Sequence, residues 1–121
     1  MEKLTNKEEE IMRILWDLEN AFVKEILPHV TDKKLHYNTV STIVRKLEEK
    51  KYVAHKAYGK THQYYPIISK EEYRKQFMKL ATKRFFDSSY KSVVSFFAKE
   101  EKISAKELRE ILDIIENKEE Q

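Results

Sequence analysis

Apolar residues recur at helical spacing in the middle of the chain, and the pattern then changes to alternation. Over residues 37–51, four apolar residues fall at i, i+3, i+4 and i+7, which predicts a helix with one buried face. They are Val40, Ile43, Val44 and Leu47. The period then changes to alternation over residues 52–57 and 62–66, on either side of the turn Tyr58-Gly59-Lys60-Thr61, which holds the only glycine. A lone glycine between two β-prone runs predicts a hairpin turn with positive φ.

The N-terminal third predicts two further helices. Thr5, followed three residues later by Glu8, fits a capping box that starts a helix running to about Glu19. A short second helix is expected over residues 22–29. We also expect Leu35 to form a strand of one or two residues that joins the hairpin.

The C-terminal half predicts three helices and no strand. Ser69 with Glu72, and Ser104 with Glu107, fit capping boxes at the starts of two of them. Residues 87–89 interrupt the apolar periodicity and predict a break. The expected fold class is therefore mainly α with a small β-hairpin.

The polar face of the central helix has an unusual composition. It consists of Asn38, Ser41, Thr42 and Arg45. An ordinary solvated face mixes lysine with glutamate, whereas this one is short-chained and free of acids, which suits close approach to base edges. A polar-faced helix followed by a basic hairpin is the order of a winged helix-turn-helix DNA-binding domain, in which the helix enters the major groove. Lys56 and Lys60, near the hairpin tip, would then reach phosphate.

The net charge of +3 conceals a basic centre. Residues 33–68 carry eight basic and two acidic side chains, and residues 69–98 carry seven and three. Residues 1–32 and 99–121 are net acidic. Such a basic centre is the footprint of phosphate binding. Charge alone leaves an ordinary lysine-rich surface equally open.

Several function classes have no support in the sequence. There is no cysteine, and the four histidines (His29, His36, His55 and His62) lack metal-ligand spacing, so we expect no metal site and no cofactor. His55 and His62 should face each other across the hairpin as surface or groove-edge residues. One glycine allows no phosphate-binding glycine loop and no nucleophile elbow, so we expect no enzyme. The N-terminus lacks the apolar core of a signal peptide and no window is apolar enough to insert into a membrane, which predicts a cytoplasmic protein.

The apolar stripes of the C-terminal half need a partner to cover them. We expect residues 1–68 to form the DNA-binding domain and residues 69–121 a helical dimerisation domain of a two-fold homodimer. Packing back onto the first domain is the alternative, and a ligand pocket lined by the aromatic residues is another. The residues expected at the dimer interface are Phe77, Leu80, Phe85, Tyr90, Val93, Val94, Phe97, Leu108, Ile111, Leu112 and Ile115.

Three segments together resemble the penicillinase repressor family (BlaI/MecI, with the copper-responsive CopY branch). They are Leu15-Trp16, the run from Tyr37 through Asn38-Thr39-Val40-Ser41-Thr42-Ile43-Val44-Arg45-Lys46-Leu47 to Tyr52, and Tyr64-Tyr65-Pro66. The central run is similar to the family pattern T-V-x-T-L-L-x-R-L-x-x-K-G-Y/F, with Lys51 where the family usually has glycine. The likeness is greatest to the cysteine-free BlaI/MecI branch, and copper sensing through a C-terminal cysteine cluster is excluded.

This resemblance implies a homodimeric repressor of resistance genes. Family members occupy inverted-repeat operators, often with TACA-type half-sites. In the β-lactam branch a membrane sensor-protease signals cleavage of the repressor before a phenylalanine. The equivalent bond here joins Ser95 and Phe96, with serine where the family has asparagine.

The sequence thus leads to one function hypothesis, a winged-helix transcriptional repressor that binds double-stranded operator DNA as a homodimer. A ligand-responsive regulator and a protein-interaction module on the same fold are the alternatives. The expected base-facing residues are Asn38, Thr39, Ser41, Thr42, Arg45 and Lys46. The expected phosphate-contacting residues are Lys33, Lys34, Tyr37, Lys56 and Lys60.

Overall fold

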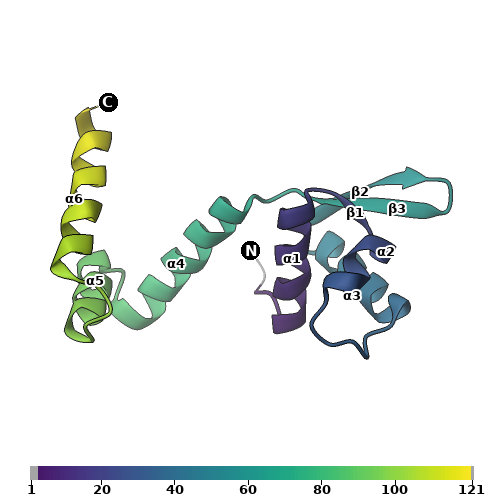
Figure 1. The fold of residues 1–121 in the computed structure, drawn as a ribbon, viewed down its shortest axis with the longest axis horizontal. Coiled ribbons are helices and arrows are strands. Elements are labelled where there is room, and N and C mark those ends of the chain that lie inside the picture. The colour runs from purple at the N-terminus through teal and green to yellow at the C-terminus, as the bar shows by residue number, and fades with distance from the viewer. Residues whose placement is uncertain (1–2, 121) are drawn as a thin grey trace. The chain divides into compact units, whose positions relative to one another are not determined.

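The computed structural model describes the backbone of residues 3–120 and the side chains of residues 3–114. The chain forms two compact units, residues 1–74 and 75–121. The first contains three α-helices, a short 3-10 helix, the beginning of a fourth α-helix and a small antiparallel sheet, and the second is helical (Figure 1). The expected class, mainly α with a β-hairpin, is confirmed. The functional boundary after residue 68 stays a prediction.

Helix α1 (Asn6–Leu18) begins at the predicted capping box. The amide of Glu8 donates to Thr5 Oγ1 over 3.2 Å, and the amide of Thr5 donates to Glu8 Oε1 over 2.8 Å. Reciprocal bonds of this kind satisfy two backbone donors that a helix start otherwise leaves unpaired. They fix where α1 begins.

The sheet has the strand order β1-β3-β2. Strands β2 (Val53–Tyr58) and β3 (Thr61–Pro66) form the predicted hairpin, and Gly59 takes φ +63° at its turn. The third strand is β1 (Ala21–Phe22), which pairs with β3, so the expectation of a strand at Leu35 was wrong. The amide of Phe22 donates to Glu25 Oε1 over 2.9 Å. This contact holds Phe22 in an extended conformation where a helix was expected.

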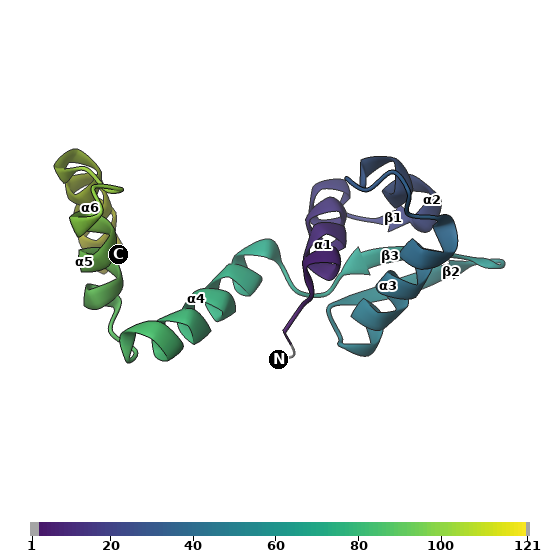
Figure 2. The same cartoon turned by 90° about the horizontal axis from the view of Figure 1, so that it is seen from below.

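Helices α2 (Val23–Ile26), η1 (Leu27–His29) and α3 (Tyr37–Glu49) complete the first unit. Figure 2 shows α3 beside the β2–β3 hairpin. The N-cap of α3 is His36, which makes no side-chain capping bond. After the helix, Lys51 takes φ +68°. It therefore adopts the left-handed conformation for which the family uses glycine.

The core of the first unit combines the inward faces of α1, α3 and the hairpin. From α3, Val40, Val44 and Leu47 are buried as predicted, whereas Ile43 is only partly buried at the edge. From the other elements, Ile11, Met12, Leu15, Tyr52 and Val53 are buried. Removing this apolar surface from water is the main stabilising term in a domain of this size.

The second half contains α4 (Lys70–Phe86), α5 (Tyr90–Lys99) and α6 (Ala105–Glu120). The predicted break lies between α4 and α5, where Asp87 and Ser88 both take positive φ. The predicted capping bonds of Ser69 and Ser104 are present. Within residues 3–120, no helix is long and apolar enough to cross a membrane.

Candidate nucleic-acid interface

The polar face of α3 is held in order by its own hydrogen bonds. Thr42 Oγ1 donates to the backbone oxygen of Asn38 over 2.9 Å, and the Arg45 guanidinium donates to Thr42 Oγ1 over 3.3 Å. Both Thr42 and Arg45 are exposed. The guanidinium therefore lies along the helix surface with donors to spare, because an arginine has five N–H groups.

The other expected base-facing residues follow the same helix surface. Asn38, Thr39 and Lys46 are exposed, and Ser41 is half-buried. Helical spacing thus distributes all six candidates along the outer side of α3, with Ser41 closest to the core. This part of the surface offers hydrogen-bond donors and acceptors of short reach, which is what base-edge contacts require.

A concave region of about 740 Å³ lies beside this face, between α3, the start of α2 and the hairpin. It brings together four of the candidates, Tyr37, Ser41, Arg45 and Lys60. Asn38, Thr39, Thr42 and Lys46 from α3, together with Lys33, Lys34 and Lys56, do not line it. The candidates therefore divide into those on the open helix surface or nearby loops and those around the concavity.

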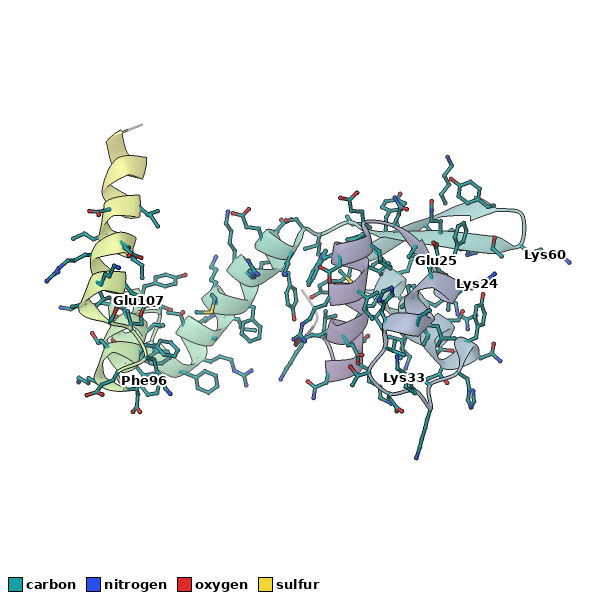
Figure 3. The ribbon with its side chains drawn as sticks, in the orientation of Figure 1. Lys24, Glu25, Lys33, Lys60, Phe96 and Glu107 are labelled. Atoms are coloured by element: carbon teal, nitrogen blue, oxygen red, sulfur yellow. The ribbon has the colours of Figure 1, made fainter. Side chains whose placement is uncertain are left out.

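Sequence reasoning missed several residues that line the same concavity. Lys24 and Glu25 come from α2, and His62 comes from β3. Figure 3 shows Lys24, Glu25 and Lys60 gathered on the hairpin side of the first unit. The pairing of β1 with β3 places α2 beside the hairpin, and no local sequence pattern signals that pairing.

Two of the expected phosphate-contacting lysines have partners in the structure. Lys33 Nζ donates to the backbone oxygen of Pro28 over 2.9 Å, and Lys56 Nζ lies 5.4 Å from the centre of the Tyr58 ring. Both contacts are made by exposed side chains, so water or an anion readily replaces them. Lys34 is exposed in the same loop as Lys33.

The two hairpin histidines are packed against each other as predicted. The His55 and His62 rings are stacked with centres 4.0 Å apart and an interplanar angle of 6°. The sequence did not reveal that His55 Nδ1 also contacts Glu48 Oε2, over 2.5 Å, at the end of α3. Burial and the nearby charge of Glu48 raise the pKa of Tyr64, so its phenol remains protonated at neutral pH. The contact between His55 and Glu48 joins the hairpin to α3.

The described side chains form no group of three or more histidines or carboxylates placed to hold a metal ion. The electrostatics of the concavity are instead dominated by cations, namely Lys24, Arg45 and Lys60, against the single carboxylate of Glu25. Such a site attracts an anion.

Comparisons with known proteins agree with this architecture. The DNA-binding domain of the repressor BlaI, a solved structure, superposes with a TM-score of 0.51 at 22% identity, covering 60% of this chain and 94% of that chain. This likeness confirms the winged-helix fold.

Sequence relatives extend over almost the whole chain. Methicillin resistance regulatory protein MecI from Staphylococcus aureus (strain N315) is 23% identical over 117 residues, which cover 96% of this chain and 95% of that protein. Penicillinase repressor from Staphylococcus aureus is 23% identical over 114 residues, covering 93% and 90%. The family model described as penicillinase repressor matches residues 4–117. The chain therefore belongs to the penicillinase repressor family.

Proposed function

We propose that this protein is a transcriptional repressor that occupies an inverted-repeat DNA operator as a homodimer. The observation that carries the proposal is the acid-free, exposed polar face of α3 beside a concavity in which cations outnumber acids. A helix of this kind fits the major groove, and a basic hairpin beside it meets the flanking phosphates. Occupancy of the operator would exclude RNA polymerase.

In this proposal Arg45 reads a base. Its bond to Thr42 uses one of five guanidinium donors, and the side chain is exposed. Arginine paired with guanine is the most frequent specific contact in the major groove. Asn38, Thr39, Ser41, Thr42 and Lys46 supply the remaining contacts. The lysines at 33, 34, 56 and 60, with Tyr37, meet phosphates and supply affinity that depends on salt.

The dimer would form through the second half of the chain. Its apolar side chains are exposed in the single chain: Phe85 is 74% exposed and Phe77 is 54% exposed. Leu80, Tyr90, Val94, Phe97, Ile111 and Leu112 are also exposed, and Leu108 is half-buried. Of the other residues expected at the interface, Val93 is already buried within its own chain, and the side chain of Ile115 lies outside the described residues. Exposed apolar surface of this extent favours a partner that covers it.

Release by proteolysis would act on the bond between Ser95 and Phe96. This bond lies in the middle of α5, where the backbone is helical. Proteases bind their substrates in extended form, so α5 must open before cleavage, and local opening of a short helix requires less free energy than global unfolding. We therefore propose that an inducing pathway, such as a membrane sensor-protease, acts on an opened form of α5.

The test is binding to a short duplex with an inverted TACA/TGTA repeat beside a scrambled duplex, titrated across salt concentration. We expect preference for the palindrome at two chains per duplex. The slope of log K against log salt should be about −0.9 per phosphate contacted. Equal, weak binding to both duplexes would remove the assigned operator, and no binding at low salt would overturn the DNA-binding function.

Arg45→Ala tests the base-reading role, with Arg13→Ala as the matched control. Arg13 is an exposed arginine of α1 that forms an ion pair with Glu9 over 3.7 Å. Arg45→Ala should reduce the preference for the palindrome by about 1–3 kcal/mol, whereas Arg13→Ala should leave it unchanged. If Arg45→Ala weakens both duplexes equally, Arg45 contacts phosphate and not a base.

A further inference from the structure

Cations from three separate segments meet at the concavity beside α3. Lys24 belongs to α2, Arg45 belongs to α3, and Lys60 belongs to the hairpin turn. Their backbone positions are fixed relative to one another because β1 pairs with β3 and α3 packs on the sheet. Lys24 and Lys60 can hold an anion in this hollow, and Arg45, proposed above to read a base, adds to its positive potential. Figure 3 shows Lys24 and Lys60 on the same side of the first unit.

His62 lines the same concavity, and its ring orientation is fixed by neighbours. It stacks on His55 at 4.0 Å, and His55 is in turn held by Glu48 at 2.5 Å. The Tyr64 ring lies 6.2 Å from the His62 ring and 5.6 Å from the His55 ring. His62 is exposed, so a ligand in the concavity reaches it without any rearrangement of the hairpin.

We propose that the concavity holds a backbone phosphate of bound DNA, and that His62 donates a hydrogen bond to this phosphate as an imidazolium. This inference rests on the proposed function. It adds His62 and Lys24 to the DNA-contacting residues, and it links DNA binding to the uptake of a proton at His62.

The charges that face His62 explain why the proton arrives with the phosphate. A phosphodiester brings a negative charge into the hollow, so the bound state favours the protonated ring. The titratable and charged groups around His62 are Lys24 and Glu25 from α2, Tyr37, Arg45 and Glu48 from α3, and His55, Lys60 and Tyr64 from the hairpin.

The linkage has a definite sign. Because the DNA-bound state takes up a proton, affinity is higher at low pH and falls as the pH rises. A histidine side chain changes its charge within the range of about pH 5 to 8, so the dependence should be measurable between about pH 6 and pH 8. We expect affinity for the palindrome to fall about tenfold per bound chain over this range.

The experiment measures the affinity of the full chain for the palindromic duplex at pH 6, 7 and 8, at constant ionic strength. His62→Gln removes the titrating group, and His62→Lys replaces it with a permanent charge. His29→Gln is the matched control, because His29 lies at the end of η1 and does not line the concavity. Thermal unfolding of each variant establishes that the fold is retained.

We expect the wild type and His29→Gln to share one pH slope. His62→Gln should bind about as weakly at pH 6 as the wild type does at pH 8, and His62→Lys should bind tightly at every pH, both with a reduced slope. A wild-type slope that survives in His62→Gln would overturn the inference while leaving the repressor function intact. Absence of binding to the palindromic duplex at low salt would overturn both this inference and the proposed repressor function.

Discussion

Glu8 and Lys50 form an ion pair that joins the start of α1 to the end of α3. Lys50 Nζ lies 2.8 Å from Glu8 Oε1, which also accepts the amide of Thr5. Glu8 is only 3% exposed, and its second carboxylate oxygen is buried with no hydrogen-bond partner within the described chain. Lys50 is the C-cap of α3. The pair therefore fixes α3 against the rest of the first unit.

Lys50→Met should destabilise the protein more than Glu8→Gln does. Removing one partner of a fully buried ion pair costs about 3–5 kcal/mol, because it leaves an uncompensated charge. The Lys50 side chain is 21% exposed and Thr5 still donates to the carboxylate, so we expect a smaller cost of about 2–3 kcal/mol. Glu8→Gln keeps an acceptor for Thr5 and leaves an ammonium that reaches water, so its cost should be about 1 kcal/mol.

The assay is urea denaturation followed by far-ultraviolet circular dichroism, at one fixed protein concentration for all variants. A double-mutant cycle with Glu8→Gln/Lys50→Met isolates the pair, and the double variant should recover much of the stability lost in Lys50→Met. Equal costs for the two single variants, or no recovery in the double variant, would refute this reasoning.

The pH dependence gives a second readout. Burial alone raises the pKa of Glu8. The hydrogen bond and positive charge of Lys50, together with the hydrogen bonds of Thr5, outweigh burial and hold the pKa below the ordinary value of 4.5. The wild-type pair therefore contributes stability above pH 4.5, and this contribution is lost as the pH falls through the lowered pKa. In Lys50→Met burial is no longer offset by the lysine, so the stability difference from wild type should be largest at pH 7 and shrink toward pH 4.

Two further substitutions test the backbone and the core. Lys51→Gly should stabilise the protein by about 0.5–1 kcal/mol, because Lys51 has φ +68° and a side chain is disfavoured there. Lys46→Gly, inside α3, is the control and should destabilise the protein by about 1 kcal/mol. Loss of stability in Lys51→Gly would contradict this. Trp16→Phe removes the indole N–H that donates to the backbone oxygen of Ile68 over 2.9 Å. The free energy of unfolding, measured by urea denaturation, should fall by about 1–2 kcal/mol. A loss below about 0.5 kcal/mol would mean that water replaces the bond.

Local sequence patterns predicted the elements whose cause is itself local. The spacing of Val40, Val44 and Leu47 identified the buried face of α3, and Gly59 identified the hairpin turn. The capping residues Thr5 and Ser104 identified helix starts, because their hydrogen bonds span only three residues. Each of these features is determined by chemistry within one or two helical turns.

The features that sequence reasoning missed depend on distant partners. The residues of β1 form a strand because Ala21 meets Tyr64 across the sheet, although the apolar pattern around Phe22 is equally compatible with a helix. Lys50 and Glu8 are 42 residues apart, so no local signal marks their ion pair. The concavity was missed for the same reason, since it forms only when β1 brings Lys24 to the hairpin.

Strand β2 lies at one edge of the sheet, because the strand order is β1-β3-β2. Strand β2 pairs with β3 on one side, and no other strand of the described chain pairs with its second side. An open strand edge invites another chain to extend the sheet, which leads to aggregation. Lys56 lies in the middle of this edge and is exposed, and a lysine in that position discourages strand addition because the incoming chain would bury its charge. Lys56, which we propose contacts phosphate, therefore also protects this strand edge against aggregation.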